Sequence, residues 1–181
     1  MSNATQIVRF TITLSDVDRG VYDTLELRAA QHPSETDAYL MTRVIAHALE
    51  WSDGLSFSRG LCVPDEPAVW GHDPTGALTH WIEVGNPKPE RLHRAAKACP
   101  YVRVYTYKDP EVLRRQVAGK TIHRGAEIEI VALPASVLDP LGETLKRANE
   151  WTLMRSDGDL YVTVGELSVS CPVSPRPLLG N

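Results

Sequence analysis

The 181-residue sequence lacks long apolar runs and has few cysteines. No run approaches the roughly 20 apolar residues of a membrane-spanning helix, so we expect no membrane association. The N-terminus, MSNATQIVRF, has neither the basic nor the apolar segment of a secretory signal. The three cysteines, Cys62, Cys99 and Cys171, are widely spaced. They favour free thiols in a reducing cytoplasm over a disulfide framework or a zinc site.

The sequence also lacks a basic excess, because its formal net charge is −4. This argues against coating nucleic acid through bulk charge, but not against a local basic groove. The six histidines form no H-x-x-x-H pattern, and there is no Walker-type or G-x-G-x-x-G loop. Zinc enzymes and those nucleotide-binding loops are therefore disfavoured. The length suits one domain, residues 1–181, which we expect to be monomeric.

Both ends of the chain carry hairpin signals. Residues 7–14 and 22–29 alternate apolar and polar side chains around a turn-rich segment, which predicts an N-terminal hairpin within 1–31. Residues 151–155 and 160–167 flank Ser156-Asp157-Gly158-Asp159, which predicts a C-terminal hairpin within 149–171. The two hairpins could pair into a second small sheet. Residues 172–181 contain three prolines and predict an extended or frayed tail.

Strands and helices alternate in the middle of the chain, within a predicted core of residues 34–148. Strands are predicted at 77–84, 102–107 and 126–133, and helices at 89–98, 110–118 and 135–148. This order predicts an α/β (α+β) fold with a mixed central sheet flanked by helices. Residues 52–74 are rich in glycine and proline and predict an irregular segment, apart from a short strand at 55–59.

A first helix is predicted from about Ser34, its expected N-cap. An apolar stripe lies on one face, and the opposite face carries Glu35, Tyr39, Arg43, His47 and Glu50. Two interpretations of this polar face remain open. It is a solvated surface, or Glu35 or Arg43 reaches into a functional site.

Two acidic positions suggest a site for a divalent metal. Glu83 lies near the end of an apolar strand, where a carboxylate is costly unless it meets a cation, a metal or hydrogen-bond donors. Asp65 lies just upstream, in Pro64-Asp65-Glu66-Pro67. Two such acids meet the residue-type requirement for Mg²⁺. Alternatively, Asp65 is a turn residue and Glu83 pairs with Arg59 or Arg91.

The helix after this strand carries a basic edge. Phosphodiester hydrolysis requires positive charge near the transition state, and the candidates are Lys88, Arg91, Arg94 and Lys97. A solvated helix face is the alternative. Two interpretations of Cys62 are open: it is a nucleophile or, more simply, a small buried hydrophobic residue. Tyr101, Tyr105 and Tyr107 either stack bases or pack within the fold.

Four strings occur in order along the chain: Ser15-Asp16-Val17-Asp18-Arg19, His32-Pro33-Ser34-Glu35, Arg59-Gly60-Leu61-Cys62 followed by Asp65-Glu66-Pro67, and Trp81-Ile82-Glu83-Val84-Gly85-x-Pro87. Together they resemble the YaeQ family of bacterial proteins over nearly the whole chain. The resemblance implies a variant of the PD-(D/E)XK nuclease-like fold, whose core is a helix, a three-strand meander, a helix and a further strand.

The resemblance also implies roles for individual residues. Asp65 and Glu83 would be the two acids of the superfamily's site, with the Val84 carbonyl and Glu35 as further ligands of Mg²⁺ or Mn²⁺. The lysine of the superfamily's triplet is replaced by Gly85. Arg91 or Arg94 would supply positive charge, with Lys88 and Arg59 also contacting phosphate. Because a guanidinium stays protonated, arginine cannot act as the general base.

The sequence is therefore compatible with three functions. The first is a cytoplasmic, Mg²⁺-dependent phosphodiesterase or nuclease-like enzyme acting on nucleic acid, with metal-bound water as nucleophile. The second is a catalytically inactive module of the same fold that binds nucleic acid or a protein partner. The third is an interaction domain in which a salt bridge neutralises Glu83. The missing lysine favours the second function, unless an arginine points toward the acids.

Overall fold

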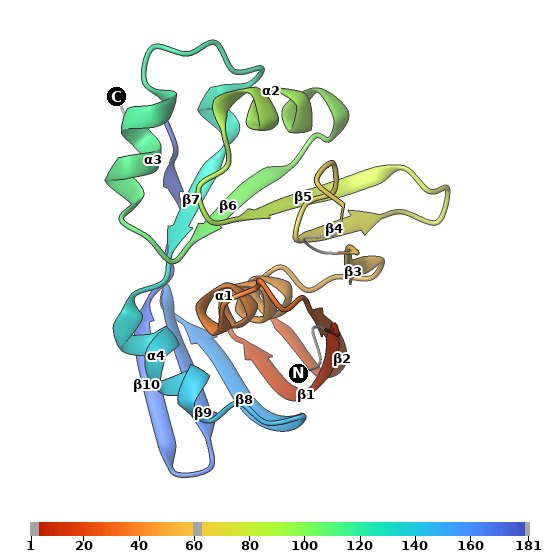
Figure 1. The fold of residues 1–181 in the computed structure, drawn as a ribbon, viewed down its shortest axis with the longest axis vertical. Helices are drawn as coiled ribbons and strands as arrows, with labels where there is room; N and C mark the ends of the chain where they lie inside the picture. The colour runs from red at the N-terminus through yellow and green to blue at the C-terminus, as the bar shows by residue number, and fades with distance from the viewer. Residues whose placement is uncertain (1–3, 60–62, 180–181) are drawn as a thin grey trace.

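The computed structural model describes residues 4–59 and 63–179, and these form two mixed β-sheets and four α-helices. The helices are α1 (Asp37–Leu49), α2 (Pro89–Ala98), α3 (Pro110–Val117) and α4 (Ala135–Glu143). A 3₁₀ turn, Gly125–Glu127, precedes β7. The α1 helix lies between the two sheets, while α2 and α3 cover the far side of the second sheet (Figure 1). The predicted combination of a mixed sheet with flanking helices is confirmed.

The first sheet joins the two ends of the chain. Its order is β10-β9-β8-β1-β2. The strands are β1 (Gln6–Asp16), β2 (Val21–Gln31), β8 (Ala148–Ser156), β9 (Asp159–Val164) and β10 (Leu167–Pro172). β1 pairs antiparallel with β2 and parallel with β8. The two hairpins therefore do pair with each other, as the sequence suggested.

The second sheet carries the candidate site. Its order is β11-β7-β6-β5-β4-β3. The strands are β3 (Leu55–Phe57), β4 (Val69–His72), β5 (Leu78–Val84), β6 (Val102–Thr106), β7 (Glu129–Ala132) and β11 (Arg176–Pro177). β3, β4 and β5 form an antiparallel meander, and β6 and β7 continue it in parallel.

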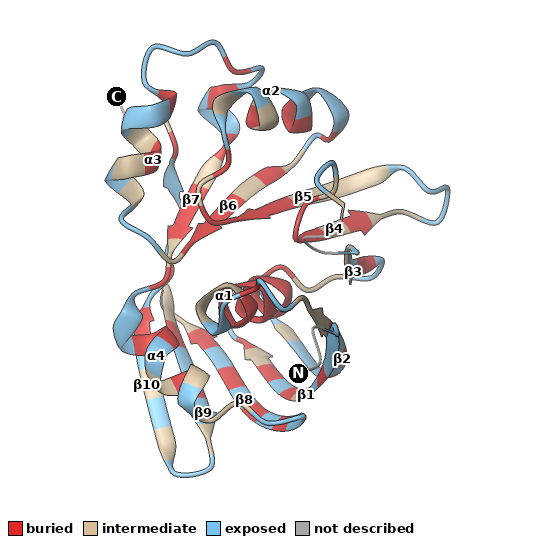
Figure 2. Ribbon diagram, viewed as in Figure 1, coloured by how far each residue is buried: buried red, intermediate tan, exposed pale blue. Residues whose placement is uncertain are grey.

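The α1 helix differs from its prediction in two ways. Thr36, not Ser34, caps it, because the Thr36 hydroxyl accepts a hydrogen bond from the Tyr39 amide. The polar face is not solvated, since α1 has a sheet on both sides (Figure 2). Arg43 is 1% exposed, and His47 and Glu50 are also buried. The polar stripe therefore faces a second packing partner that helical periodicity cannot reveal.

Three further expectations are wrong. Residues 52–74 are less irregular than predicted, because they contain β4 as well as β3. The α4 helix ends at Glu143, five residues earlier than predicted, and Ala148 begins β8. The predicted strand at 160–167 is divided by a turn at Gly165, where φ is 59°, and the chain returns as β10.

The C-terminal tail is not frayed over its described part. β11 pairs with β7, and the Leu178 amide donates to the Ile128 carbonyl at 2.9 Å. Leu178 is fully buried within the second of two hydrophobic clusters, between α2, α3 and the second sheet. The larger cluster fills the space around α1. In the described helices, no segment is both long and apolar enough to cross a membrane.

Candidate functional site at the end of β5

Glu83 is held at the end of β5 by its neighbours in the sheet and in α2. It pairs in register with Val104 of β6, which fixes the strand at this point. Trp81 and Glu83 are two residues apart and therefore share a face of the sheet. The Trp81 indole nitrogen donates to Glu83 Oε1 at 2.8 Å. The carboxylate is only 5% exposed, so it needs hydrogen-bond donors such as this indole to remain ionised.

Gly85 turns the chain from β5 toward α2. Its φ is 96°, a left-handed conformation that glycine adopts without strain. Pro89 occupies the first turn of α2, where its missing N–H has no helical partner to lose. The helix then presents Arg91 to the end of β5. A lysine at position 85 would be strained in this backbone conformation.

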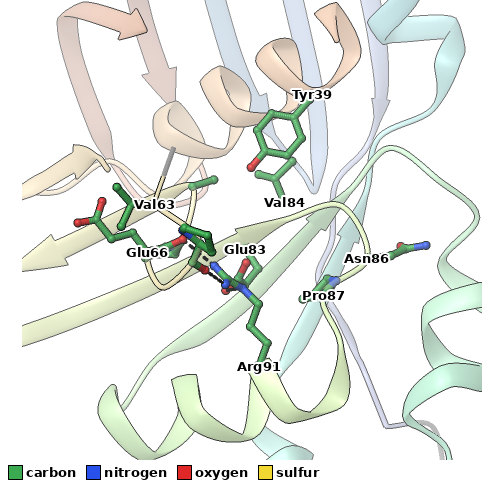
Figure 3. Close-up of a pocket in the computed structure, with 11 residues that line it drawn as sticks. Tyr39, Val63, Glu66, Glu83, Val84, Asn86, Pro87 and Arg91 are labelled. Atoms are coloured by element: carbon green, nitrogen blue, oxygen red, sulfur yellow. Dashed lines mark hydrogen bonds and ion pairs between the residues drawn. The ribbon is translucent and has the colours of Figure 1, made fainter. Parts of the chain in front are cut away.

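Arg91 connects three parts of the site. Its Nε donates to Glu83 Oε1 at 2.7 Å, and its Nη2 donates to the Glu66 carbonyl at 2.6 Å. Its Nη1 donates to the Pro64 carbonyl. Figure 3 shows the guanidinium reaching from α2 to Glu83 beneath the 63–67 segment. Arg91 therefore neutralises the buried acid and fastens this segment against the sheet.

These residues line a cleft of about 320 Å³. Its walls include Tyr39 from α1, Glu66 from the loop, Val84 and Asn86 from the end of β5, and Arg91. Burial raises the pKa of Glu83, and the opposing effects of Arg91 and Trp81 do not fully offset it. Burial also raises the pKa of Tyr39 to about 12, so its phenol stays protonated at neutral pH. The cleft thus combines one buried carboxylate with a fixed cation and a neutral hydroxyl.

The predicted acids occupy different environments. Asp65 lies exposed in a turn, and its neighbour Glu66 lines the cleft. The Glu66 carboxylate, however, points away from Glu83 (Figure 3) and binds Arg59 at 2.7 Å. The Arg59 hydrogen bond lowers the pKa of Glu66. Glu35 is buried and forms a two-pronged ion pair with Arg43 at 2.8 and 3.1 Å.

The predicted basic residues also occupy different environments. Arg91 contacts Glu83, whereas Lys88 and Arg94 are exposed. The Arg59 side chain is 74% exposed and forms an ion pair with Glu66. Of the two arginines suggested as partners for Glu83, Arg91 is the one that binds it. Cys62 lies outside the described residues, and Cys99 and Cys171 are buried free thiols.

Some contributors to the cleft were not identified from the sequence. Tyr39 was placed on the polar face of the first predicted helix, but its position at the cleft required the fold. The carbonyls of Pro64 and Glu66 carry no side-chain signal, so their contact with Arg91 required the fold. Across residues 4–59 and 63–179, no three His, Cys, Asp or Glu side chains form a group suited to hold a metal ion.

Comparison with known proteins gives a consistent result. The family model described as YaeQ protein matches residues 1–173. A protein named "Uncharacterized protein YaeQ" from Escherichia coli K12 is 35% identical over 101 residues, and one from Salmonella typhi is 32% identical over 101 residues. Each alignment covers 56% of this chain and 56% of the relative, so the chain matches just over half the length of these curated proteins.

Two crystal structures align with almost all of the chain. The YaeQ protein from Pseudomonas syringae has a TM-score of 0.85 and 30% identity, covering 98% of this chain and 97% of that one. The YaeQ protein from Xanthomonas axonopodis pv. citri has a TM-score of 0.87 and 30% identity, covering 98% and 100%. The two-sheet architecture is therefore shared with these proteins.

Proposed function

The chain belongs to the YaeQ family, and from that premise we propose that it is a cytoplasmic, metal-dependent phosphodiesterase of nuclease-like type that acts on nucleic acid. The observation that carries the proposal is the contact between Arg91 and the buried Glu83 at the end of β5. This contact places a cation in the cleft although position 85 carries no lysine. An ion pair at Glu83 is also what the interaction-domain alternative predicts, so the metal titration described below decides between the two.

The order of elements supports a place in the PD-(D/E)XK nuclease-like superfamily. The run α1, β3, β4, β5, α2 and β6 consists of a helix, an antiparallel meander, a second helix and a parallel strand. The same order of elements is expected from the resemblance, which supports the proposal. Fold alone does not establish activity, so the argument rests on the residues of the cleft.

The ligand types at the cleft suit Mg²⁺ or Mn²⁺. Glu83 supplies a carboxylate and Val84 a main-chain carbonyl, and hard cations prefer such oxygen ligands. Asp65 or Glu66 would supply a second carboxylate after a side-chain rotation. Glu35 is committed to Arg43 and fits this role least. When bound, the ion would supply Lewis-acid activation of the phosphoryl group.

Arg91 has a specific part in this proposal. Its Nε donates to Glu83, while its Nη1 and Nη2 donate to the carbonyls of Pro64 and Glu66. Once a divalent ion balances the charge of Glu83, the Nε–H would be free to donate a charge-assisted hydrogen bond to a phosphate oxygen. Arg91 would orient the diester and stabilise its developing charge, and Lys88, Arg94 and Arg59 would bind flanking phosphates from the surface.

A second candidate is a binding module without chemistry. Arg91 donates through all three of its nitrogens to protein acceptors, and each carboxylate of the cleft wall already has an arginine partner. If these pairs persist in solution, the cleft would hold a phosphodiester or a protein partner without hydrolysing it.

Titration of Mg²⁺ and Mn²⁺ by calorimetry tests the first function. We expect binding by the wild type and at least about tenfold weaker binding by Glu83→Gln, which removes the charge and keeps the shape, a loss of about 1.4 kcal/mol. Glu90→Gln is the matched control, because Glu90 is exposed at the start of α2. Cleavage of labelled single- and double-stranded DNA and RNA should show the same dependence on Glu83.

The outcomes separate the candidates. Metal binding that Glu83→Gln abolishes, together with metal-dependent cleavage, supports the enzyme. Nucleic-acid binding without metal binding or cleavage supports the inactive module. If the wild type binds neither metal nor nucleic acid, both proposals fail.

A further inference from the structure

A second pocket lies between the two sheets, on the other side of β5 from Glu83. It has a volume of about 470 Å³. His80 lines it, and since His80 and Glu83 are three residues apart on a strand, they face opposite sides of the sheet. Arg19 from the β1–β2 turn, Arg155 from β8 and Arg103 from β6 form its charged wall. The pocket is therefore separate from the cleft at the end of β5.

The three arginines are held rigidly by their inner edges. Arg19 Nε and Arg155 Nε both donate to the Asp16 carboxylate, at 2.7 and 3.0 Å. Arg19 Nη1 donates to the Trp51 carbonyl and Arg155 Nη2 to the Leu49 carbonyl, at the C-terminal end of α1. Arg103 binds Glu50 and Glu129, each at 2.7 Å. Because these contacts already fix the side-chain conformations, binding a ligand would cost little side-chain entropy.

The acceptors around this pocket are already used. Both Asp16 oxygens accept from arginine, and Glu50 accepts from the hydroxyls of Tyr101 and Tyr105 as well as from Arg103. The Asp18 oxygens accept from the amides of Asp157 and Gly158 at 2.7 and 2.9 Å. The carboxylates of the pocket are therefore occupied, which favours a ligand that brings acceptors over one that brings only donors.

Several arginine N–H donors, in contrast, are not used. Arg19 Nη2, Arg155 Nη1 and Arg103 Nε have no hydrogen-bond partner within residues 4–59 and 63–179. The Arg103 Nε is also buried, and a buried donor without a partner calls for an explanation. A bound acceptor would reach the outer Nη groups of Arg19 and Arg155, whereas the Arg103 Nε is buried beside the Tyr101 ring.

The charges around the pocket favour a ligand with no more than one negative charge. Three guanidiniums face four carboxylates, those of Asp16, Glu50, Asp18 and Glu129. No excess of positive charge is therefore left to balance a dianion. A carboxylate carries one charge, whereas a phosphate monoester carries nearly two at neutral pH. Leu49, Val173, Pro175 and the Tyr101 ring add apolar wall for an organic body.

From this geometry we propose that the inter-sheet pocket binds a small organic carboxylate, with Arg19 and Arg155 as its charged contacts. The volume lies within the range of small-molecule sites, which is about 300–1,000 Å³. The carboxylate would lie against the guanidinium edges that point away from Asp16, and its body would lie between Tyr101 and Pro175.

Calorimetric titration of the full chain with sodium benzoate at constant ionic strength tests this proposal, with sodium acetate and inorganic phosphate as comparison probes. We expect benzoate to bind more tightly than either. Arg19→Gln should weaken benzoate binding at least about tenfold. Arg28→Gln is the matched control, since Arg28 is an exposed arginine on β2 that does not line this pocket.

A second variant guards against an effect of Arg19→Gln on folding. Ser174 is exposed at the pocket rim, so Ser174→Trp would fill the space and leave every arginine pair intact. It should abolish benzoate binding without lowering the melting temperature. Tighter binding of phosphate than of benzoate, equal binding by Ser174→Trp, or no heat from benzoate at about 10 mM would overturn the proposal. Glu83→Gln should leave benzoate binding unchanged, so failure at one site is distinguishable from failure at the other.

Discussion

At the scale of single residues, a buried ion pair joins Arg43 of α1 to Glu35, which precedes the helix. Arg43 and Glu35 are both about 1% exposed at their side chains and neutralise each other. The Arg43 guanidinium also lies over the Phe57 ring at 5.0 Å. Burial raises the pKa of Glu35, although Arg43 opposes this effect. Neither side chain is available to the solvent or to the cleft beside Glu83.

His47 leads to a prediction about pH and stability. It stacks on Trp51, its Nδ1 has no partner among the described residues, and burial lowers its pKa to about 4. Because the unfolded state binds the proton more readily, stability should fall as the pH drops from 6.5 toward 4, by about 3 kcal/mol from this group. Urea unfolding of the wild type and His47→Phe at several pH values measures this contribution.

The His47→Phe variant should be less sensitive to pH over that range, because phenylalanine keeps the stacking and removes the titration. His123→Phe serves as control, since His123 is exposed. An unchanged pH dependence in His47→Phe would show that other groups cause the loss of stability.

At the scale of elements, the segment before β3 depends on one close backbone approach. Gly54 has φ of 86°, and a Cβ there would lie 2.0 Å from the His72 carbonyl oxygen. The His72 amide in turn donates to the Gly54 carbonyl at 3.1 Å. This approach holds the start of β3 against the end of β4. It also explains how a segment rich in glycine forms part of a sheet.

Gly54→Ala should therefore destabilise the protein much more than Gly76→Ala. Gly76 has the same φ, but a Cβ there would meet no atom within 4 Å. We expect a loss of about 1 kcal/mol for Gly76→Ala, from backbone strain alone, and about 3 kcal/mol or more for Gly54→Ala. Chemical denaturation of both variants gives the comparison. Equal losses would mean that the contact with His72 is relaxed at little cost.

At the scale of the whole molecule, the last described residues close the second hydrophobic cluster. Leu178 packs with Leu92, Leu113 and Ile128, far from it in sequence. Leu178→Ala should cost about 3 kcal/mol, because it leaves a cavity between α2, α3 and the sheet. Arg176→Ala, at an exposed position of β11 two residues before Leu178, should cost less than about 0.5 kcal/mol.

Thermal and urea unfolding measure both tail variants. Loss of the tail contact should lower the stability of the whole domain, since β11 adds to the sheet that carries Glu83. If Leu178→Ala and Arg176→Ala behave alike, the tail contributes little to the core.

The amino-acid sequence by itself determined the parts of this protein that depend on local spacing. The hairpin of β1 and β2, the bounds of α2 and the alternation of strands and helices from β5 to α4 follow from side-chain periodicity and turn residues. The same local signals pointed to Glu83 as a buried acid and to Arg91 as one of its two suggested partners.

Tertiary structure decided the rest, because burial on a second side and long-range contacts leave no local signal. Only the fold covers the polar stripe of α1, brings the proline-rich tail to β7, and places Glu66 rather than Asp65 on the cleft wall. Only the fold gathers Arg19, Arg103 and Arg155, from positions up to 136 residues apart in the chain, around one pocket. Periodicity identifies one buried face of an element, whereas the partners of each face depend on how distant segments pack.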